Sequence, residues 1–364
     1  MLMKLKGGSI NMFGYISNYY LEKIERKNGY NELYVENIDE LTELIRPDKP
    51  KRIKDLFNQI YLNTIEKDGV LKLYFNNFLY RGISDSNHDL SPTLFRIEQY
   101  KELNHKDFIR KEFNILKKFI ESCDFANTQI PNDSFKLREI FKNENKFLTT
   151  YFSENEGTLS EDLYELAAFA QHYGVPTRLL DWSYHPLVSL YFASIGAIKS
   201  FTRTKKNAYF SLWVYSPITH VNPHDQKILD HKIKIIDVPR AINQHVSFQQ
   251  GCFIMVEQAN NDNNFDFLSK DSNEDSSENI NLNNIIEDPK FLRLNDLLHK
   301  FDLNSNLLKI NIPIKLALEV YEFCNIYHFN SATLFRGPHG GSQNVLDSLE
   351  IEKFEKISEN LKGA

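Results

Sequence analysis

The sequence predicts an α+β protein in which helices flank a mostly antiparallel sheet. Stretches rich in β-branched and aromatic residues, which favour strands, occur at 70–80, 208–215, 252–257 and 308–312. Segments with helical periodicity lie between them. The strand–helix–strand units of ~30 residues that build doubly wound parallel sheets do not recur.

Composition is that of a globular protein. Of 364 residues, 41% are hydrophobic, 25% charged and 13% aromatic. The net charge of −6 argues against non-specific nucleic-acid binding, which needs a basic surface. No signal peptide and no run of ~18 apolar residues is found, so we expect a cytoplasmic protein without membrane contact. Three scattered cysteines, Cys123, Cys252 and Cys324, are expected to be buried.

The first half of the chain alternates between helix and strand signals. Residues 1–35 contain a charged, helix-like run and are expected to form an N-terminal helical extension. Asn37 precedes a helix that ends before Pro47. The strand at 70–80 is expected to bring Arg81 to its end. Further helices are predicted at 101–121, 160–173 and 185–197.

The second half is interrupted by an acidic segment. Residues 260–285 contain six acids and one lysine, and we expect 258–285 to be a solvated or disordered insertion. Helices are predicted after it at about 288–302, 314–329 and 345–362. We therefore expect residues 36–364 to form one elaborated domain with a helical C-terminal part.

Three segments carry polar groups suited to a functional site. In Tyr80-Arg81-Gly82, arginine offers a rigid set of donors for phosphate or carboxylate, and glycine allows close approach of a backbone or ligand. A surface arginine before a turn is the alternative.

The second segment, Gln171 to Ser183, places polar groups at a turn between two apolar helices. We expect Asp181 or Ser183 to cap the second helix, with Arg178 as a fixed cation nearby. The alternative is that Asp181 and Arg178 only cap and pair with each other, and that His172 is a core residue.

The third segment, Ser247 to Phe253, enters a strand. Its two amides before a glycine, Gln249 and Gln250, can bind the polar edge of a ligand or form a β-bulge.

Together these segments resemble the FRG domain family. The match consists of YRG at 80–82, LSPTLFR at 90–96, QHYGVPTRLLDWSYHPLVSLYFA at 171–193 and FQQGCF at 248–253. The resemblance covers roughly residues 37–260. It departs at Ser189, where alanine is commoner, and near the C-terminus at 334–341. Such proteins occur in bacteria and phages, often near defence genes.

The resemblance implies a set of site residues, without a metal. Those expected to act in catalysis are Arg81, His172, Asp181 and Gln250. Those expected to bind the ligand are Tyr80, Gly82, Tyr173, Thr177, Arg178, Trp182 and Gln249.

The order of these parts is similar to that in mono-ADP-ribosyltransferases. We therefore expect an ADP-ribosyltransferase-like fold and an NAD-processing activity, in anti-phage defence or as a toxin effector. Arg81 would bind the pyrophosphate of the substrate NAD, and Tyr173 or Trp182 would stack on nicotinamide. The usual glutamate is absent from the 249–251 segment, and Asp181 or Glu257 would replace it.

Two other functions stay open. One is a module that binds a nucleotide signal without catalysis and relays it to a protein partner. The other is a phosphodiester hydrolase, which would need clustered acids for a metal.

Overall fold

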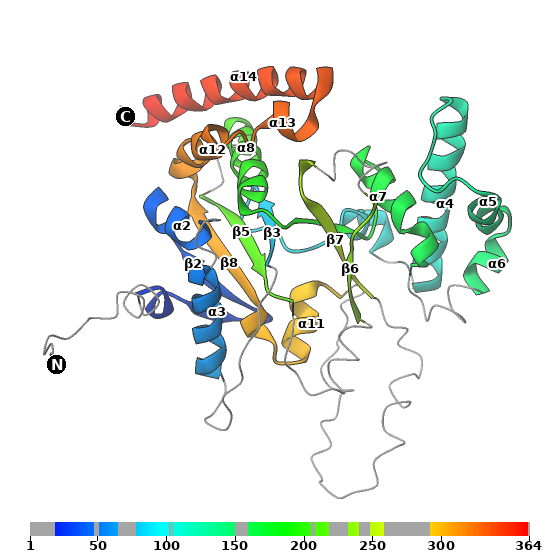
Figure 1. The fold of residues 1–364 in the computed structure, drawn as a ribbon, viewed down its shortest axis with the longest axis horizontal. Coiled ribbons are helices and arrows are strands. Elements are labelled where there is room, and N and C mark those ends of the chain that lie inside the picture. The colour runs from blue at the N-terminus through cyan, green and yellow to red at the C-terminus, as the bar shows by residue number, and fades with distance from the viewer. Residues whose placement is uncertain are drawn as a thin grey trace, which may run out of the picture.

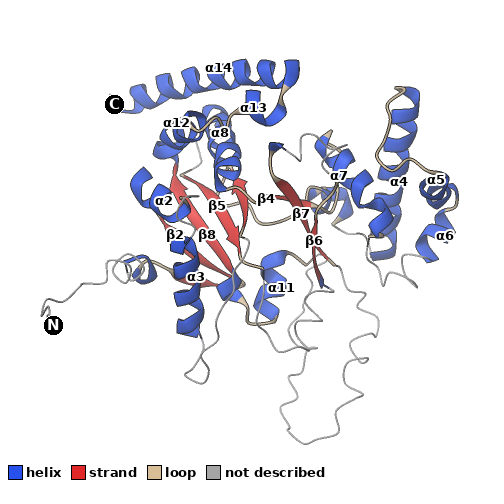
Figure 2. Ribbon diagram, in the orientation of Figure 1, coloured by secondary structure: helices blue, strands red, loops and turns tan. Residues whose placement is uncertain are grey.

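The computed structural model describes a mixed eight-stranded sheet with helices on both faces (Figures 1 and 2). The described residues are 19–46, 51–64, 78–101, 103, 105–149, 159–204, 208–217, 232–239, 248–257 and 292–362. The strand order is β1-β2-β8-β5-β3-β4-β7-β6. Only β2 and β8 pair in parallel among these strands. The predicted α+β class with a mostly antiparallel sheet is thus confirmed.

The strands differ in length from three to seven residues. They are β1 (Glu25–Lys27), β2 (Tyr30–Tyr34), β3 (Leu79–Ile83), β4 (Leu180–Ser183), β5 (Tyr209–Tyr215), β6 (Ile233–Ile236), β7 (Gly251–Val256) and β8 (Leu307–Pro313). The expectations at 208–215, 252–257 and 308–312 are confirmed by β5, β7 and β8. Arg81 lies in the middle of β3 rather than at the end of a strand; most of the predicted 70–80 strand lies outside the described residues.

Helices surround this sheet. They are α2 (Ile38–Ile45), α3 (Lys51–Thr64), α4 (His105–Phe125), α5 (Phe135–Lys142), α6 (Glu144–Thr149), α7 (Tyr164–His172), α8 (Pro186–Thr204), α11 (Leu294–Lys300), α12 (Ala317–Ile326), α13 (Ser331–Phe335) and α14 (Gly337–Lys362). Each helix predicted from periodicity has a counterpart here, and Asn37 caps α2 as expected, by accepting from Glu40 N.

The N-terminal segment differs from the expected helical extension. Within its described part only residues 19–22 are helical, and the hairpin of β1 and β2 follows. Strand β2 pairs with β8, nearly 280 residues later. The charged run looked helical because local sequence does not reveal this long-range pairing.

Two hydrophobic layers enclose the sheet. On one face, residues of α2, α3, α8 and α12 pack on alternate residues of β5 and β8 such as Leu212 and Ile310. On the other face, α11 packs against Trp182, Trp213 and Tyr215. A third cluster joins α4, α5, α6 and α7 to Phe253 and Met255 of β7 and forms the right-hand side of Figure 1.

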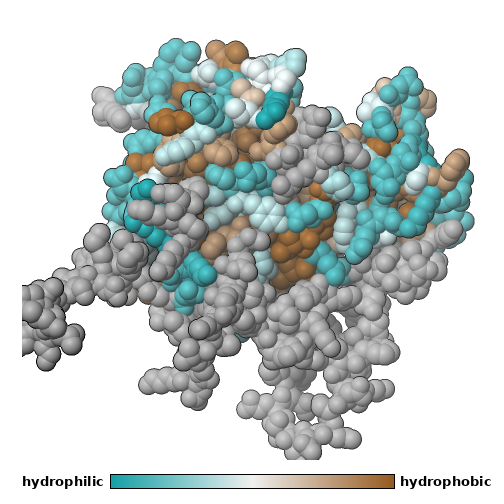
Figure 3. All heavy atoms as spheres, viewed as in Figure 1, coloured by the Kyte–Doolittle hydropathy of each residue, from teal (hydrophilic) through white to brown (hydrophobic). Residues whose placement is uncertain are grey.

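The outer surface in Figure 3 is mostly hydrophilic, with hydrophobic side chains at several places. On α14, Val345 and Leu346 are more than half exposed. All three cysteines are free and buried, as expected. Among the described helices none combines the length and hydrophobicity needed to cross a membrane. The predicted acidic insertion lies outside the described residues.

A buried carboxylate joins the C-terminal helices to α8. Asp347 of α14 has a side chain that is 0% exposed and lies 2.5 Å from Lys199 Nζ. Its oxygens also accept hydrogen bonds from Tyr191 of α8, Ser331 of α13 and Gln343 of α14. Burial acts to raise the pKa of Asp347, but these donors outweigh it and hold the pKa below the ordinary value of 3.8.

Replacing Asp347 by asparagine should therefore destabilise the fold. We expect Asp347→Asn to lower the free energy of unfolding at pH 7 by about 3 kcal/mol, because the partly exposed Lys199 loses its counter-charge and the hydrogen bonds to the buried carboxylate are disrupted. Since the folded pKa lies below the unfolded one, the carboxylate stabilises the fold above about pH 4 and stops doing so as pH falls through its folded pKa. Urea unfolding of both proteins from pH 7 to pH 3 measures this.

The control is Glu355→Gln, on an exposed position of the same helix, which should change stability by less than about 0.5 kcal/mol. Equal stability of wild type and Asp347→Asn at pH 7 would contradict the role given to Asp347.

Candidate functional site

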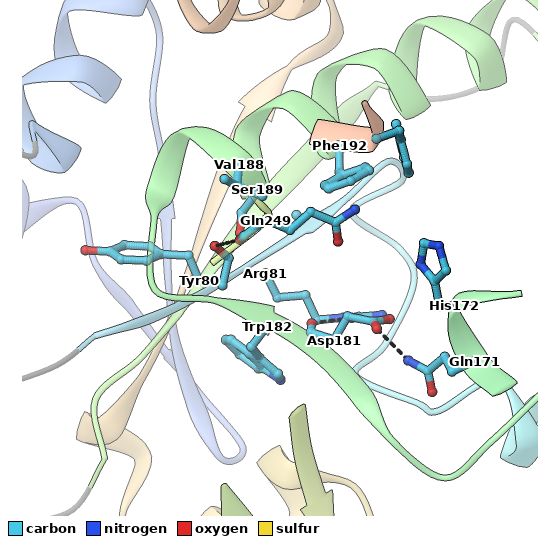
Figure 4. Close-up of a pocket in the computed structure, with 13 residues that line it drawn as sticks. Tyr80, Arg81, Gln171, His172, Asp181, Trp182, Val188, Ser189, Phe192 and Gln249 are labelled. Carbon is cyan, nitrogen blue, oxygen red and sulfur yellow. Dashed lines mark hydrogen bonds and ion pairs between the residues drawn. The ribbon is translucent and has the colours of Figure 1, made fainter. Parts of the chain in front are cut away.

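A cavity of about 330 Å³ opens where β3 and β4 lie beside the start of α8 (Figure 4). This volume is at the lower end of the range found for small-molecule sites. The residues that line it are Tyr80, Arg81, Gly82, Gln171, His172, Asp181, Trp182, Ser183, Val188, Ser189, Phe192, Gln249 and Phe335. All three segments singled out in the sequence therefore contribute to one cavity.

Arg81 spans the gap between two diverging strands. Strands β3 and β4 are paired at a single position, Tyr80 with Ser183. Next to it, Arg81 Nη1 donates a hydrogen bond to the carbonyl oxygen of Asp181 at 2.5 Å, and lies 3.7 Å from the carboxylate Oδ2 of the same residue. The side chain of Arg81 thus replaces part of the missing strand ladder, and its guanidinium lies on the floor of the cavity.

The charge of Arg81 is incompletely compensated. Burial lowers the pKa of its guanidinium, Asp181 acts in the opposite direction, and the positive charge of Arg96 lowers it further. Its Nε is buried and has no hydrogen-bond partner among the described residues. An arginine remains charged in such a setting, so an anion entering the cavity would be favoured there.

Gly82 allows α8 to lie directly on β3. A Cβ atom at this position would be 1.9 Å from the carbonyl oxygen of Ser189 and 2.9 Å from Cβ of Ala193. The close approach expected from the sequence is therefore an approach of the α8 backbone. It brings Ser189 and Phe192 of α8 into the lining of the cavity that also contains Arg81.

A hydrogen-bond chain orients Asp181. The hydroxyl of Thr177 accepts from Leu179 N at 3.2 Å, so its own proton is donated to Oε1 of Gln171. The amide of Gln171 then presents Nε2 to Asp181 Oδ1, at 2.6 Å. The carboxylate is held by this donor on one side and by Arg81 on the other, while its side chain stays 63% exposed.

This chain depends on how α7 ends. Gly174 has φ +84°, which ends the helix, and its N–H donates to Gln171 O at 2.9 Å. His172, the last residue of α7, lines the cavity from the side opposite α8 (Figure 4).

The start of α8 is capped differently from the expectation. Asp181 lies in β4 and caps no helix; instead, Nδ1 of His185 accepts from Leu187 N at 3.2 Å. Ser183 accepts from His185 N at 3.0 Å and donates to Gln249 O at 2.7 Å. It therefore links β4 and α8 to the residues just before β7. The reason for the difference is that β4 extends to Ser183, leaving only two residues before the helix.

The two neighbouring glutamines have different positions. The side chain of Gln249 points into the cavity (Figure 4). Gln250 has φ +45°, its carbonyl accepts from Tyr184 N at 3.0 Å, and it does not line the cavity. Its backbone turn aims Gln249 inward, and a direct catalytic role for Gln250 remains a prediction.

Arg178 belongs to a buried ion pair. Its side chain is 1% exposed and that of Glu112 of α4 is 4% exposed. Nε donates to Glu112 Oε1 at 2.7 Å and Nη2 donates to Oε2, so the pair is bidentate. The alternative in which Arg178 pairs with Asp181 is wrong. Arg178 does not line the cavity, and the geometry favours a structural role that fastens α4 to the 174–180 turn.

Three aromatic residues from the sequence motifs do not offer a free ring to the cavity. The ring of Tyr80 points away from it and that of Trp182 lies in the core beneath the sheet (Figure 4). Tyr173 is 60% exposed, packs on Phe169 and is not a lining residue. Stacking of nicotinamide on Tyr173 or Trp182 thus remains a prediction without geometric support.

Sequence reasoning missed several lining residues. Val188, Ser189 and Phe192 project from the first turns of α8, a segment for which the sequence predicted a helix but no ligand-binding residues. Phe335 comes from α13, in the C-terminal region where the motif match departs, and no local signal identifies it.

Comparison with known proteins bears on the same region. Residues 76–200 match the FRG domain; this range begins just before β3 and includes most of α8. The chain carries an FRG domain. No curated protein and no solved structure matches the chain. Within the FRG domain lie Arg81, Gln171 and Asp181, while Gln249 and Phe335 complete the cavity from outside it.

The acidic groups near the cavity are few. Asp181 is the one carboxylate among the described lining residues. Glu257 follows β7 at the end opposite Gln249 and is buried, so it does not line the cavity. The described part of the chain holds no group of three His, Cys, Asp or Glu side chains placed to bind a metal ion.

The buried ion pair of Arg178 and Glu112 predicts that a conservative substitution of Glu112 strongly destabilises the fold. Glu112→Gln keeps the shape of the side chain but leaves the Arg178 guanidinium buried without its counter-charge, so we expect a loss of about 3–5 kcal/mol in unfolding free energy. Chemical denaturation measures it. In the exposed pair of Arg138 with Asp124, whose side chain is 52% exposed, Asp124→Asn should cost less than about 1 kcal/mol. Similar losses in both variants would contradict the assignment.

Proposed function

We propose that the cavity binds the ADP-ribosyl part of NAD and that the FRG-domain protein is an ADP-ribosyltransferase-like or NAD-processing enzyme. The observation that supports this proposal is that three segments meet at strands β3, β4 and β7, which are neighbours in the sheet. Arg81 on β3, Ser183 at the end of β4 and Gln249 before β7 meet at one cavity. This is the order of parts for which the sequence is similar to mono-ADP-ribosyltransferases.

Each group has a role in this proposal. Arg81 binds a phosphate of the pyrophosphate, because its half-buried guanidinium has a buried Nε without a partner among the described residues and lies 3.7 Å from the nearest carboxylate oxygen of Asp181. Asp181, oriented by Gln171, stabilises the positive charge that develops on the ribose as the bond to nicotinamide breaks. It also accepts a hydrogen bond from the attacking water or acceptor hydroxyl. Gln249 supplies an amide to a hydroxyl of the ribose.

The proposal extends to the biological setting. We propose that such an activity serves bacterial anti-phage defence or a toxin effector, acting on a protein target or under the control of a regulatory partner.

A second function is favoured by the scarcity of acids. Asp181 is already engaged by both Gln171 and Arg81, and it is the one acid among the described lining residues. A cavity of this kind suits a module that binds a nucleotide signal without breaking a bond. The two functions differ in whether bound NAD is consumed.

Removal of Arg81 tests the proposal. We expect purified protein to release nicotinamide from NAD and Arg81→Ala to reduce that rate at least about a hundredfold, since a charge-stabilising group is lost. The melting temperature should fall by only a few degrees, because one partly exposed hydrogen bond worth about 1 kcal/mol is removed.

The matched control is Arg26→Ala, an exposed arginine that pairs with Asp302 far from the cavity; it should leave the rate unchanged. Binding of NAD without nicotinamide release would move the assignment to the signal-binding module. A collapse of stability in Arg81→Ala would show that Arg81 is mainly structural and would contradict both functions.

A further inference from the structure

Two phenylalanines form a hydrophobic wall of the cavity. Phe192 of α8 and Phe335 of α13 both line it, and their ring centroids lie 5.9 Å apart with an interplanar angle of 81°. Both side chains are half-buried, so part of each ring is left uncovered by protein. Such edge-to-face pairs are rigid and present apolar surface to whatever lies beside them.

Phe192 lies across the cavity from the charged groups Arg81 and Asp181. In Figure 4, Phe192 is above the amide of Gln249, and Arg81 with Asp181 is on the opposite side. A cavity with an aromatic wall and a charged floor suits a ligand that has a planar ring and an anionic group. The motif aromatics Tyr80 and Trp182 point elsewhere, so the two phenylalanines and the imidazole of His172 are the aromatic rings that the described lining residues offer.

The position of Phe335 is fixed from both ends of its short helix. Before it, Ser331 donates to the buried carboxylate of Asp347 at 2.8 Å. After it, Arg336 has φ +48°, and its guanidinium lies 3.5 Å from the ring centroid of Phe248. Phe248 is the neighbour of Gln249. The C-terminal segment is therefore attached to the same loop that supplies the amide to the cavity.

We propose that Phe192 and Phe335 bind the planar heteroaromatic ring of a nucleotide ligand whose phosphate group binds Arg81. This inference rests on the proposed function for the phosphate, and adds the residues that recognise the base or nicotinamide ring. Because Phe335 lies outside residues 76–200, the ring site is completed by a part of the chain that the FRG domain match does not include.

Binding of three probes separates the two halves of the ligand. The probes are ADP-ribose, which has ring and phosphates, inorganic pyrophosphate, which has no ring, and adenosine, which has no phosphate. Dissociation constants are measured by calorimetry for the wild type, Phe335→Ala and Arg81→Ala. Loss of one stacked ring corresponds to a weakening of about tenfold or more.

We expect Phe335→Ala to weaken ADP-ribose and adenosine about tenfold and to leave pyrophosphate within about twofold of wild type. Arg81→Ala should show the reverse preference, with loss of pyrophosphate and retention of adenosine. Phe335→Leu, which keeps apolar volume without a ring, should behave as Phe335→Ala for adenosine. The matched control is Phe201→Ala, on the same helix as Phe192 but packed on Phe354 of α14, and it should change none of the three constants.

Equal weakening of all probes in Phe335→Ala and in Phe201→Ala would mean that the ring only packs the helices together, and would overturn the proposal. Unchanged adenosine binding in Phe335→Ala would also overturn it. Adenosine binding that requires Phe335, without any pyrophosphate binding, would support the ring site and refute the phosphate role of Arg81. A wild type that binds none of the probes would overturn both.

Discussion

Helix α8 lies so close to strand β3 that no side chain fits between them at residue 82. The carbonyl oxygen of Ser189 occupies the space that a Cβ atom of Gly82 would take. This contact sets the height of α8 above the sheet. It thereby places Phe192 in the lining of the cavity, across from Arg81, and gives the C-terminal helices a fixed surface to dock on, through the hydrogen bonds of Asp347. A glycine in the YRG motif is thus a requirement of packing, from which the site geometry follows.

The cavity exists because the sheet is interrupted beside this contact. Strands β3 and β4 share one paired position, and the side chain of Arg81 covers the gap by binding the carbonyl of Asp181. Such an arginine serves two purposes. It donates a hydrogen bond to the carbonyl oxygen of Asp181, which has no partner in the strand ladder between β3 and β4. It also keeps a positive charge at the base of a polar cavity, where solvent screening is weaker than at the surface. Arg178, the other arginine predicted for the site, is buried and forms a bidentate ion pair with Glu112, so its charge is balanced without a ligand.

The sequence predicted the secondary-structure elements and the motif residues of this site, but it did not predict which distant residues contact them. Local patterns identified β5, β7 and most helices, and the dense motif around Asp181 marked one wall of the cavity. The ion pair of Arg178 joins positions 66 residues apart, and Phe335 reaches the cavity from beyond the acidic segment. Neither has a local signal, because both depend on how distant helices dock. Trp182 is the converse case: it belongs to the motif and lines the cavity, but its ring packs in the core because strand alternation points it away from its neighbour Asp181.

A crystal structure of the protein with ADP-ribose would test the central claim most directly. We predict a phosphate oxygen within hydrogen-bonding distance of the Arg81 guanidinium, a ribose hydroxyl near Asp181, and the adenine ring against Phe192 and Phe335. Density for the ligand at another place on the surface, with Arg81 still bound only to the carbonyl of Asp181, would contradict it. In that case Arg81 would be a strand connector, and the cavity would be a by-product of the interrupted sheet.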